Sequence, residues 1–162
     1  INKAGFYALA YSKKLGTTEL NCSDPSAWIP KDATGGVQSV VWNYTYPGPG
    51  KGNGVNNQQY FTRDLPPKHQ TPVALTVSHL RPGQYAVSVY RVGYRVNDAY
   101  ATYRDLGSPA QLTKAQVAKI KFENSGAPID VRTVKIGRDG KLEQNFDLRE
   151  NDLVLITLKP QR

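Results

Sequence analysis

Residues 73–92 read Val-Ala-Leu-Thr-Val-Ser-His-Leu-Arg-Pro-Gly-Gln-Tyr-Ala-Val-Ser-Val-Tyr-Arg-Val. Apolar side chains recur at every second position in two parts of this stretch, first Val73, Leu75 and Val77, then Tyr85, Val87 and Val89. Because successive side chains of a strand point to opposite faces, the alternation predicts two half-buried β-strands, over 73–78 and 84–92. Pro and Gly stand side by side in Arg81-Pro82-Gly83, which favours a tight hairpin-like connection between the two strands.

Stretches rich in β-branched, aromatic or other apolar residues continue this pattern on both sides. They predict further strands over 37–46, 59–64, 131–136, 142–148 and 153–158. An Asp-Gly pair in Arg138-Asp139-Gly140-Lys141 favours a two-residue hairpin between the two strands that flank it.

Two helices are expected among these strands. Residues 3–15 place Phe6 and Leu9 at helical spacing, with Gly16 just beyond as a stop signal. Thr113 and Gln116 form the pattern of a capping box, which begins a second helix over 114–124. Since strands follow one another with few helices between them, the sequence predicts an antiparallel immunoglobulin-like β-sandwich with one short inserted helix and an N-terminal helix.

The composition indicates a single soluble, turn-rich globular domain. The chain has 162 residues, of which 39% are hydrophobic, with 14 Gly and 11 Pro, and a chain of this size can bury a core. No apolar run approaches the roughly 18 residues that a membrane helix needs, so no membrane partner is expected. The chain begins with Ile1 and contains no Met, from which we expect a processed chain or a piece of a longer protein.

The net charge of +8 favours anionic partners in general, but its distribution does not point to nucleic acid. Residues 1–81 hold 8 basic and 4 acidic side chains and residues 82–162 hold 13 and 9, so each half carries +4 without a basic block or tail. Cys22 is the only cysteine and forms no internal disulfide, which leaves the compartment, cytoplasmic or exported, open. With only His69 and His79 besides it, neither a metal site nor a cofactor is expected.

Cleavage of a glycoside ordinarily needs two carboxylates about 5–9 Å apart across the bond. The chain has 13 acidic residues, and most of them lie in turns or polar surroundings, where a solvated charge is expected. These are Asp32, Asp64, Asp139, Glu143, Asp147, Glu150 and Asp152. A Gly-x-Ser-x-Gly elbow is absent, and the Gly-rich stretch 48–54 lacks the Gly-Lys-Ser/Thr ending of a phosphate loop. No catalytic residue is therefore predicted in this chain.

The ten Tyr and two Trp are more suggestive. An exposed aromatic ring offers a sugar a large apolar face and a polar edge at low entropic cost. The candidates are Trp28, Trp42, Tyr44, Tyr46 and Tyr60, with Trp28, Trp42 and Tyr46 as the preferred exposed rings. Alternation turns about half of such rings toward the core of a sandwich, so packing is the competing interpretation for each of them.

The densest polar and aromatic stretch runs from Tyr90 to Tyr103 and on to the capped helix. It contains an Arg-rich strand end, then Asn97-Asp98-Ala99-Tyr100, Leu106-Gly107-Ser108-Pro109 and Leu112-Thr113-Lys114-Ala115-Gln116-Val117. In this order the motifs resemble the C-terminal β-sandwich region of glycoside hydrolase family 39, the β-xylosidase and α-L-iduronidase group. Val41-Trp42-Asn43-Tyr44 and Thr62-Arg63-Asp64-Leu65-Pro66 fit the same region, and residues 6–16 look like the last helix of that family's catalytic barrel.

The resemblance implies that the catalytic residues lie outside this chain. In that family the acid/base and the nucleophile are glutamates of a (β/α)₈ barrel, and the acid/base follows an Asn. This chain has Glu123-Asn124 and Glu150-Asn151 but no Asn-Glu pair, and it is far shorter than a barrel of about 250 residues. The resemblance divides the chain into an N-terminal helix with a linker, residues 1–20, and a β-sandwich accessory domain, residues 21–162.

We therefore expect a non-catalytic accessory domain that packs on and stabilises the barrel of a β-xylosidase-like enzyme. The contacts expected at the barrel interface, or with a xylo-oligosaccharide, come from Tyr94, Arg95, Asn97, Asp98, Tyr100 and Tyr103. The alternative is a carbohydrate-binding module for xylan-type sugars, which would use an exposed Trp. An independent small enzyme would instead require two convergent carboxylates in a pocket.

Overall fold

The structure is a computed structural model that describes residues 1–45, 64 and 66–161. The helices in these ranges are α1 (Ala4–Ser12), α3 (Ala99–Asp105) and α4 (Lys114–Glu123). The strands are β1 (Thr18–Glu19), β2 (Ala27–Trp28), β3 (Pro30–Lys31), β4 (Val37–Trp42), β5 (Gln70–Val77), β6 (Gly83–Val92), β7 (Asp130–Ile136), β8 (Leu142–Arg149) and β9 (Leu153–Pro160).

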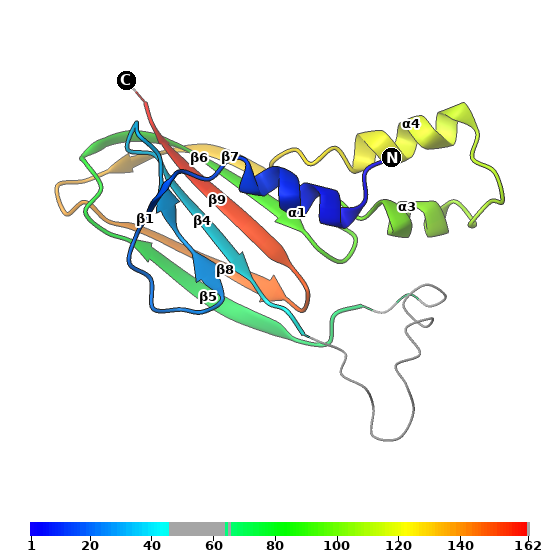
Figure 1. Cartoon of the computed structure of the whole chain (residues 1–162), viewed down its shortest axis with the longest axis horizontal. Helices are drawn as coiled ribbons and strands as arrows, with labels where there is room; N and C mark the ends of the chain where they lie inside the picture. The colour runs from blue at the N-terminus through cyan, green and yellow to red at the C-terminus, as the bar shows by residue number, and fades with distance from the viewer. Residues whose placement is uncertain (46–63, 65, 162) are drawn as a thin grey trace, which may run out of the picture.

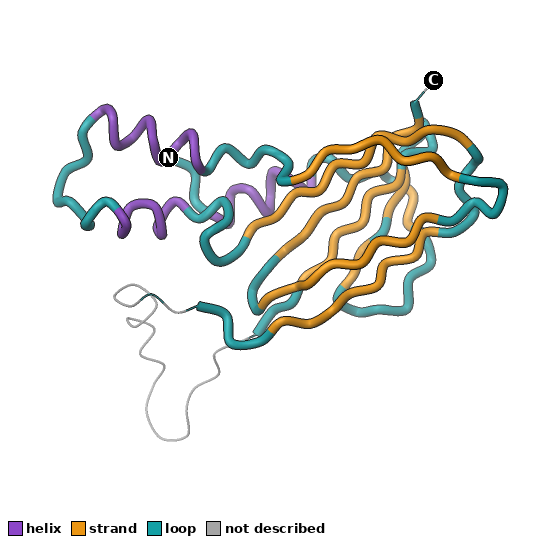
Figure 2. Tube along the Cα trace, turned by 180° about the vertical axis from the view of Figure 1, so that it is seen from behind, coloured by secondary structure: helices purple, strands orange, loops and turns teal. Residues whose placement is uncertain are grey.

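Two antiparallel sheets pack face to face, as Figure 1 shows. The larger one, sheet A, has the strand order β1-β3-β4-β9-β6-β7, with β2 also paired to β4. The smaller one, sheet B, consists of β5 and β8. The predicted antiparallel β-sandwich is therefore confirmed. Figure 2 shows α3 and α4 together beyond one end of the strands.

The alternating side chains of the sequence form the core between the sheets. Tyr85 and Val87 of β6 are buried there, opposite Leu75 and Val77 of β5. The last strand, β9, contributes Val154, Ile156 and Leu158, each without exposed surface. Burying such side chains contributes about 1.5–3 kcal/mol each, so this layer provides much of the stability of the fold.

Both predicted hairpins are wrong, because each connection passes from one sheet to the other. Arg81-Pro82-Gly83 joins β5 of sheet B to β6 of sheet A, and Asp139-Gly140 joins β7 of sheet A to β8 of sheet B. The two connections lie side by side, since the Leu80 N–H donates to the Gly140 oxygen at 2.9 Å. Local turn residues specify that the chain reverses, whereas burial of each apolar face selects the sheet in which the next strand pairs.

The expected helices are present, and one was missed. The capping box of α4 is complete, with the Thr113 hydroxyl accepting from the Gln116 N–H and the Gln116 side chain accepting from the Thr113 N–H. Residues 99–105, for which no helix was predicted, form α3. The Asp98 carboxylate caps this helix by accepting from the Ala101 N–H at 3.2 Å. This hydrogen bond stabilises the short helix, because it satisfies an N–H group of the first turn that has no partner within the helix.

Strand boundaries also differ from expectation, and two of the differences affect candidate residues. The strand predicted over 37–46 ends at Trp42, and residues 43–45 are not in a strand. The strand predicted over 59–64 falls mostly outside the described residues, and Asp64, which is described, is not in a strand.

Helix α1 covers the outer face of sheet A, away from sheet B. Tyr7 and Tyr11 pack there with Val40, Val92 and Leu155, from three neighbouring strands of that sheet. Figure 1 shows α1 lying in front of these strands. A second, smaller core on this face therefore holds α1 against sheet A.

Two tyrosines of α1 tie this helix to the segments around α3 and α4. The Tyr7 hydroxyl donates to the Asn124 backbone oxygen, and the Tyr11 hydroxyl donates to the Gly126 backbone oxygen at 3.3 Å. Asn97 Nδ2 donates to the Tyr11 hydroxyl at 3.2 Å, and its Oδ1 accepts from the Gly126 N–H at 2.8 Å. We call these five residues the polar junction. Because its side chains are buried, loss of one partner leaves another polar group unsatisfied.

The polar junction predicts a loss of stability in alkali. Burial, with smaller effects from Tyr7 and Tyr90, raises the pKa of Tyr11 to about 12, compared with about 10 in an unfolded chain. The folded chain keeps a proton that the unfolded chain releases. The contribution of protonated Tyr11 to the free energy of unfolding is therefore fully present below about pH 10 and is lost as the pH rises to about 12.

Replacing Tyr11→Phe should cost about 1 kcal/mol at neutral pH, because its hydrogen bonds are lost. The same replacement should flatten the decline in the free energy of unfolding between about pH 10 and pH 12. Urea unfolding at a series of pH values measures both effects. An equally steep alkaline decline in the variant would assign it to other groups.

Candidate functional site

A tight turn presents the segment singled out in the sequence. The N–H groups of Gly93 and Val96 donate to each other's backbone oxygens at 3.1 and 3.0 Å. Arg95 has φ +56° and Asn97 has φ +53°, a left-handed conformation that costs most residues energy. The Asp98 carboxylate supports the turn by accepting from the Arg95 N–H at 3.4 Å.

Arg95 is the centre of an exposed charged cluster. Its guanidinium bridges two carboxylates, with Nη2 2.8 Å from Asp64 Oδ2 and Nη1 2.8 Å from Asp105 Oδ2. Its Nε donates to the Tyr94 hydroxyl at 3.2 Å, and the guanidinium lies 5.6 Å from the centre of the Tyr94 ring. We call Asp64, Tyr94, Arg95 and Asp105 the Arg95 cluster. Asp105 was not among the predicted site residues, because only the formation of α3 brings it to Arg95.

The Arg95 cluster lacks the properties of a glycosidase acid/base pair. The hydrogen bond from Arg95 lowers the pKa of Asp64, and the same contact raises the pKa of Arg95. A general acid needs the opposite shift, because its carboxyl group must hold a proton near neutral pH. Both carboxylates already bind the same guanidinium, so this arrangement favours holding the loop over transferring protons.

Of the remaining predicted residues of this segment, some are buried and others are exposed at the surface. Asn97 is 7% exposed and belongs to the polar junction. Tyr100 and Tyr103 lie on α3 with ring centres 6.1 Å apart, and the Tyr103 hydroxyl donates to the Pro109 oxygen. Tyr100 is 40% exposed.

The preferred aromatic candidates are not gathered in one place. Trp28 is on β2 and is 42% exposed. Trp42 is at the end of β4 and packs partly buried against the cluster beneath α1. Tyr46 and Tyr60 lie outside the described residues.

Asp152 corrects the expectation of a solvated charge. Its side chain is fully buried and accepts from Nε and Nη2 of Arg149, at 2.9 and 3.0 Å. Arg91 Nε lies 3.8 Å from the same carboxylate, and Gly93 lies so close that a Cβ there would overlap it. The sequence signal for this pair was the three-residue spacing of Arg149 and Asp152. In the structure, the two residues flank a turn in which Asn151 takes φ +59°. Burying a carboxylate without a partner costs free energy, and the hydrogen bonds from Arg149 offset this cost for Asp152.

Other kinds of site find little support in the part of the chain that the structure describes. It holds no group of three or more His, Cys, Asp or Glu side chains that could bind a metal ion. None of its helices is long and apolar enough to span a membrane. A broad open depression of about 1010 Å³ lies at the end of the sandwich opposite α3 and α4, beside Asp32, His79 and Arg81. Cys22 is free and exposed.

Solved structures similar to this chain are glycoside hydrolases. A family 39 enzyme from Xanthomonas axonopodis pv. citri matches 96% of the chain with a TM-score of 0.86 and 31% identity. A monomeric β-xylosidase from Caulobacter crescentus CB15 matches 97% with a TM-score of 0.85 and 30% identity. A bacterial orthologue of human α-L-iduronidase shares the fold, with a TM-score of 0.74 at 18% identity over 97% of the chain. The sequence matches no protein-family model and no curated protein.

This chain spans only 30% of each of the first two enzymes and 27% of the third. The resemblance to the C-terminal β-sandwich region of glycoside hydrolase family 39 is therefore confirmed in structure.

The charge arrangement of the Arg95 cluster yields a prediction. Replacing Arg95→Ala removes the hydrogen bond that lowers the pKa of Asp64, so this pKa should rise toward its ordinary value of about 3.9. Carboxyl-carbon NMR titration of Asp64 measures the change. Arg81→Ala, which removes an equal charge at the other end of the sandwich, should leave it in place. An unchanged Asp64 pKa in the Arg95 variant would show that the contact does not persist in solution.

Proposed function

We propose that this chain is a non-catalytic accessory domain of a family 39 β-xylosidase-like glycoside hydrolase, which packs on and stabilises a catalytic (β/α)₈ barrel. The observation that carries the proposal is the coverage of the similar enzymes. At least 96% of this chain matches the Xanthomonas and Caulobacter enzymes, yet the match accounts for only 30% of each. A region that makes up less than a third of an enzyme and has a core of its own is organised as a domain beside the catalytic one.

The chemistry of the described residues supports a non-catalytic role. The two carboxylates that the fold brings together, Asp64 and Asp105, are held by Arg95. Buried Asp152 is likewise paired with Arg149. Reaction at a glycoside would require a protonated carboxyl group and a free carboxylate facing each other. In the proposal, the missing barrel supplies that pair.

Helix α1 supports the packing part of the proposal. Its Tyr7 and Tyr11 face the sheet, whereas Phe6 and Leu9 on the other side of the helix are 52% and 71% exposed. A helix that is apolar on two faces is normally covered on both. We propose that the barrel covers Phe6 and Leu9 and extends to the loop from Tyr94 to Tyr103. Residues 1–20 would then connect the barrel to the accessory domain of residues 21–162.

A chimeric enzyme tests this function. This chain would replace the matched region of the Caulobacter crescentus β-xylosidase, and thermal unfolding and turnover of an aryl β-xyloside would be measured. We expect no turnover by the isolated chain, because the paired carboxylates cannot act as acid and base. The chimera should be active and should melt above the catalytic part alone.

Leu9→Lys should lower the melting temperature of the chimera by about 5 °C or more, because it buries a charge at the interface. The isolated chain should be unaffected, since Leu9 is exposed there. Val131→Lys is the matched control, because Val131 is 64% exposed on β7, an edge strand of sheet A, and is not among the residues that pack with Tyr7 and Tyr11 of α1. Turnover by the isolated chain, or equal effects of the two variants on the chimera, would contradict the proposal.

The alternative, a carbohydrate-binding module for xylan-type sugars, is favoured by one observation, the exposure of Trp28. If this ring stacks on sugar, Trp28→Ala should weaken binding of the isolated chain to neutral xylan by about tenfold, as expected for loss of an aromatic contact. Affinity electrophoresis in gels containing xylan measures the change. Phe122→Ala removes a ring that is 84% exposed on α4 and should have no effect. Equal mobility of Trp28→Ala and the unaltered chain would remove this alternative.

A further inference from the structure

Part of the outer face of sheet A is not covered by α1. Because Tyr85, Val87 and Val89 of β6 face sheet B, the intervening residues Gln84, Ala86 and Ser88 face outward. Strand pairing places Thr133 of β7 opposite Ala86 and Thr157 of β9 opposite Ser88 on this face. We call this surface the open platform; it consists of Gln84, Ala86, Ser88, Val131, Thr133, Lys135, Thr157 and Lys159. Its side chains are small or polar apart from Val131, and its residues carry no carboxylate.

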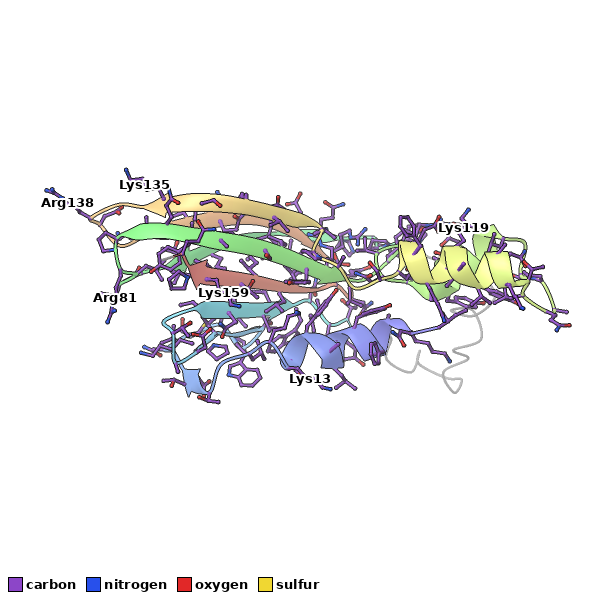
Figure 3. The ribbon with its side chains drawn as sticks, turned by 90° about the horizontal axis from the view of Figure 1, so that it is seen from above. Lys13, Arg81, Lys119, Lys135, Arg138 and Lys159 are labelled. Carbon is purple, nitrogen blue, oxygen red and sulfur yellow. The ribbon has the colours of Figure 1, made fainter. Side chains whose placement is uncertain are left out.

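Two lysines stand on opposite sides of the open platform. Lys135 pairs with Gln84 and Lys159 pairs with Ala86, so β6 lies between them. Adjacent strands are about 4.8 Å apart and the two pairing positions on β6 are two residues apart, which places the two lysine backbones roughly 12 Å apart across the platform. Both side chains are exposed. Arg81 and Arg138 extend from neighbouring connections, and Figure 3 shows all four side chains toward the same end of the sheet.

These four cations are not neutralised by the described residues. The salt bridges in the described part of the chain involve other basic residues, namely Arg91, Arg95, Lys119, Arg132 and Arg149. The acidic side chains at this end are few. Asp139 lies next to Arg138, Glu143 belongs to sheet B, and the Asp32 carboxylate already accepts hydrogen bonds from Thr34, Gly36 and Gln38.

An extended, hydroxyl-rich polyanion fits this combination of features. Lysine ammonium groups act as point charges that attract carboxylates without demanding one fixed geometry. Ser88, Thr133, Thr157 and Gln84 offer hydrogen bonds to sugar hydroxyls along a flat surface. Single-stranded nucleic acid would instead need exposed rings on which its bases stack, and the open platform has none.

We propose that the open platform binds an acidic polysaccharide, with uronic-acid carboxylates about 12 Å apart pairing with Lys135 and Lys159. The sugar class of the ligand rests on the proposed function, whereas its negative charge rests on the platform itself. Binding at this face does not require the barrel, because α1 occupies a different part of sheet A.

The isolated full chain tests the proposal by titration calorimetry with glucuronoxylan. The matched ligand is the same polysaccharide after chemical reduction of its carboxyl groups. We expect binding to glucuronoxylan at low ionic strength that weakens markedly at about 0.15 M salt, where charges are screened beyond about 8 Å. The reduced polysaccharide should bind at least about tenfold more weakly, since the ion pairs are absent.

Paired substitutions locate the site. The double variant Lys135→Gln with Lys159→Gln should bind glucuronoxylan about tenfold more weakly. The control double variant Lys13→Gln with Lys121→Gln removes the same net charge from the residue that follows α1 and from α4, and it should retain binding. Figure 3 shows Lys13 apart from the four platform-end cations. Thermal unfolding of both variants checks that they fold.

Four results would overturn the proposal. They are absence of binding by the unaltered chain, equal binding of the reduced polysaccharide, equal losses in the two double variants, and tighter binding of a DNA strand at the same salt concentration. None of these outcomes bears on turnover or melting of the chimeric enzyme, so failure here leaves the accessory-domain function to its own test.

Discussion

Burial of the first half of β9 on both faces is the constraint on which the rest of the structure depends. The last strand of the chain lies between β4 and β6, and Val154, Leu155, Ile156 and Leu158 have no exposed surface. Three of these side chains face sheet B, whereas Leu155 packs beneath α1. A strand that is apolar on both sides needs a layer on each side. The sandwich therefore depends on both ends of the chain, since α1 comes from the beginning and β9 from the end.

The polar junction extends this dependence to the helical pair. Asn97, Asn124 and Gly126 belong to segments next to α3 and α4, and their bonds to Tyr7 and Tyr11 connect them to α1. A change in α1 therefore acts on both the sheet and the loop that carries Arg95. In the proposed function, α1 also faces the barrel through Phe6 and Leu9. The stability of the accessory domain and its contact with the barrel would then depend on one nine-residue helix.

The distribution of charge separates the two ends of the sandwich. The salt bridges of the described residues lie toward the end that carries α3 and α4, where they fix turns and strand ends. The cations of the opposite end extend into solvent around a face without carboxylates. The ion pairs at the end with α3 and α4 stabilise the fold, whereas the lysines at the opposite end are the charges that the proposed ligand would contact. The even split of charge along the sequence conceals this difference, because strands distant in sequence contribute to each end.

The sequence by itself determined the local elements of this protein. Alternation over 73–92, the capping box at Thr113 and the apolar run at the C-terminus were sufficient to predict strands, a helix and an antiparallel sandwich, because each depends on neighbouring residues. The motif order was sufficient for the family resemblance. Tertiary structure alone decided which sheet follows each turn, that Asp152 is buried, and that Asp105 joins Arg95. These outcomes depend on contacts between segments that a local pattern does not encode, since apolar burial selects strand partners and only the packing of other segments removes a side chain from water.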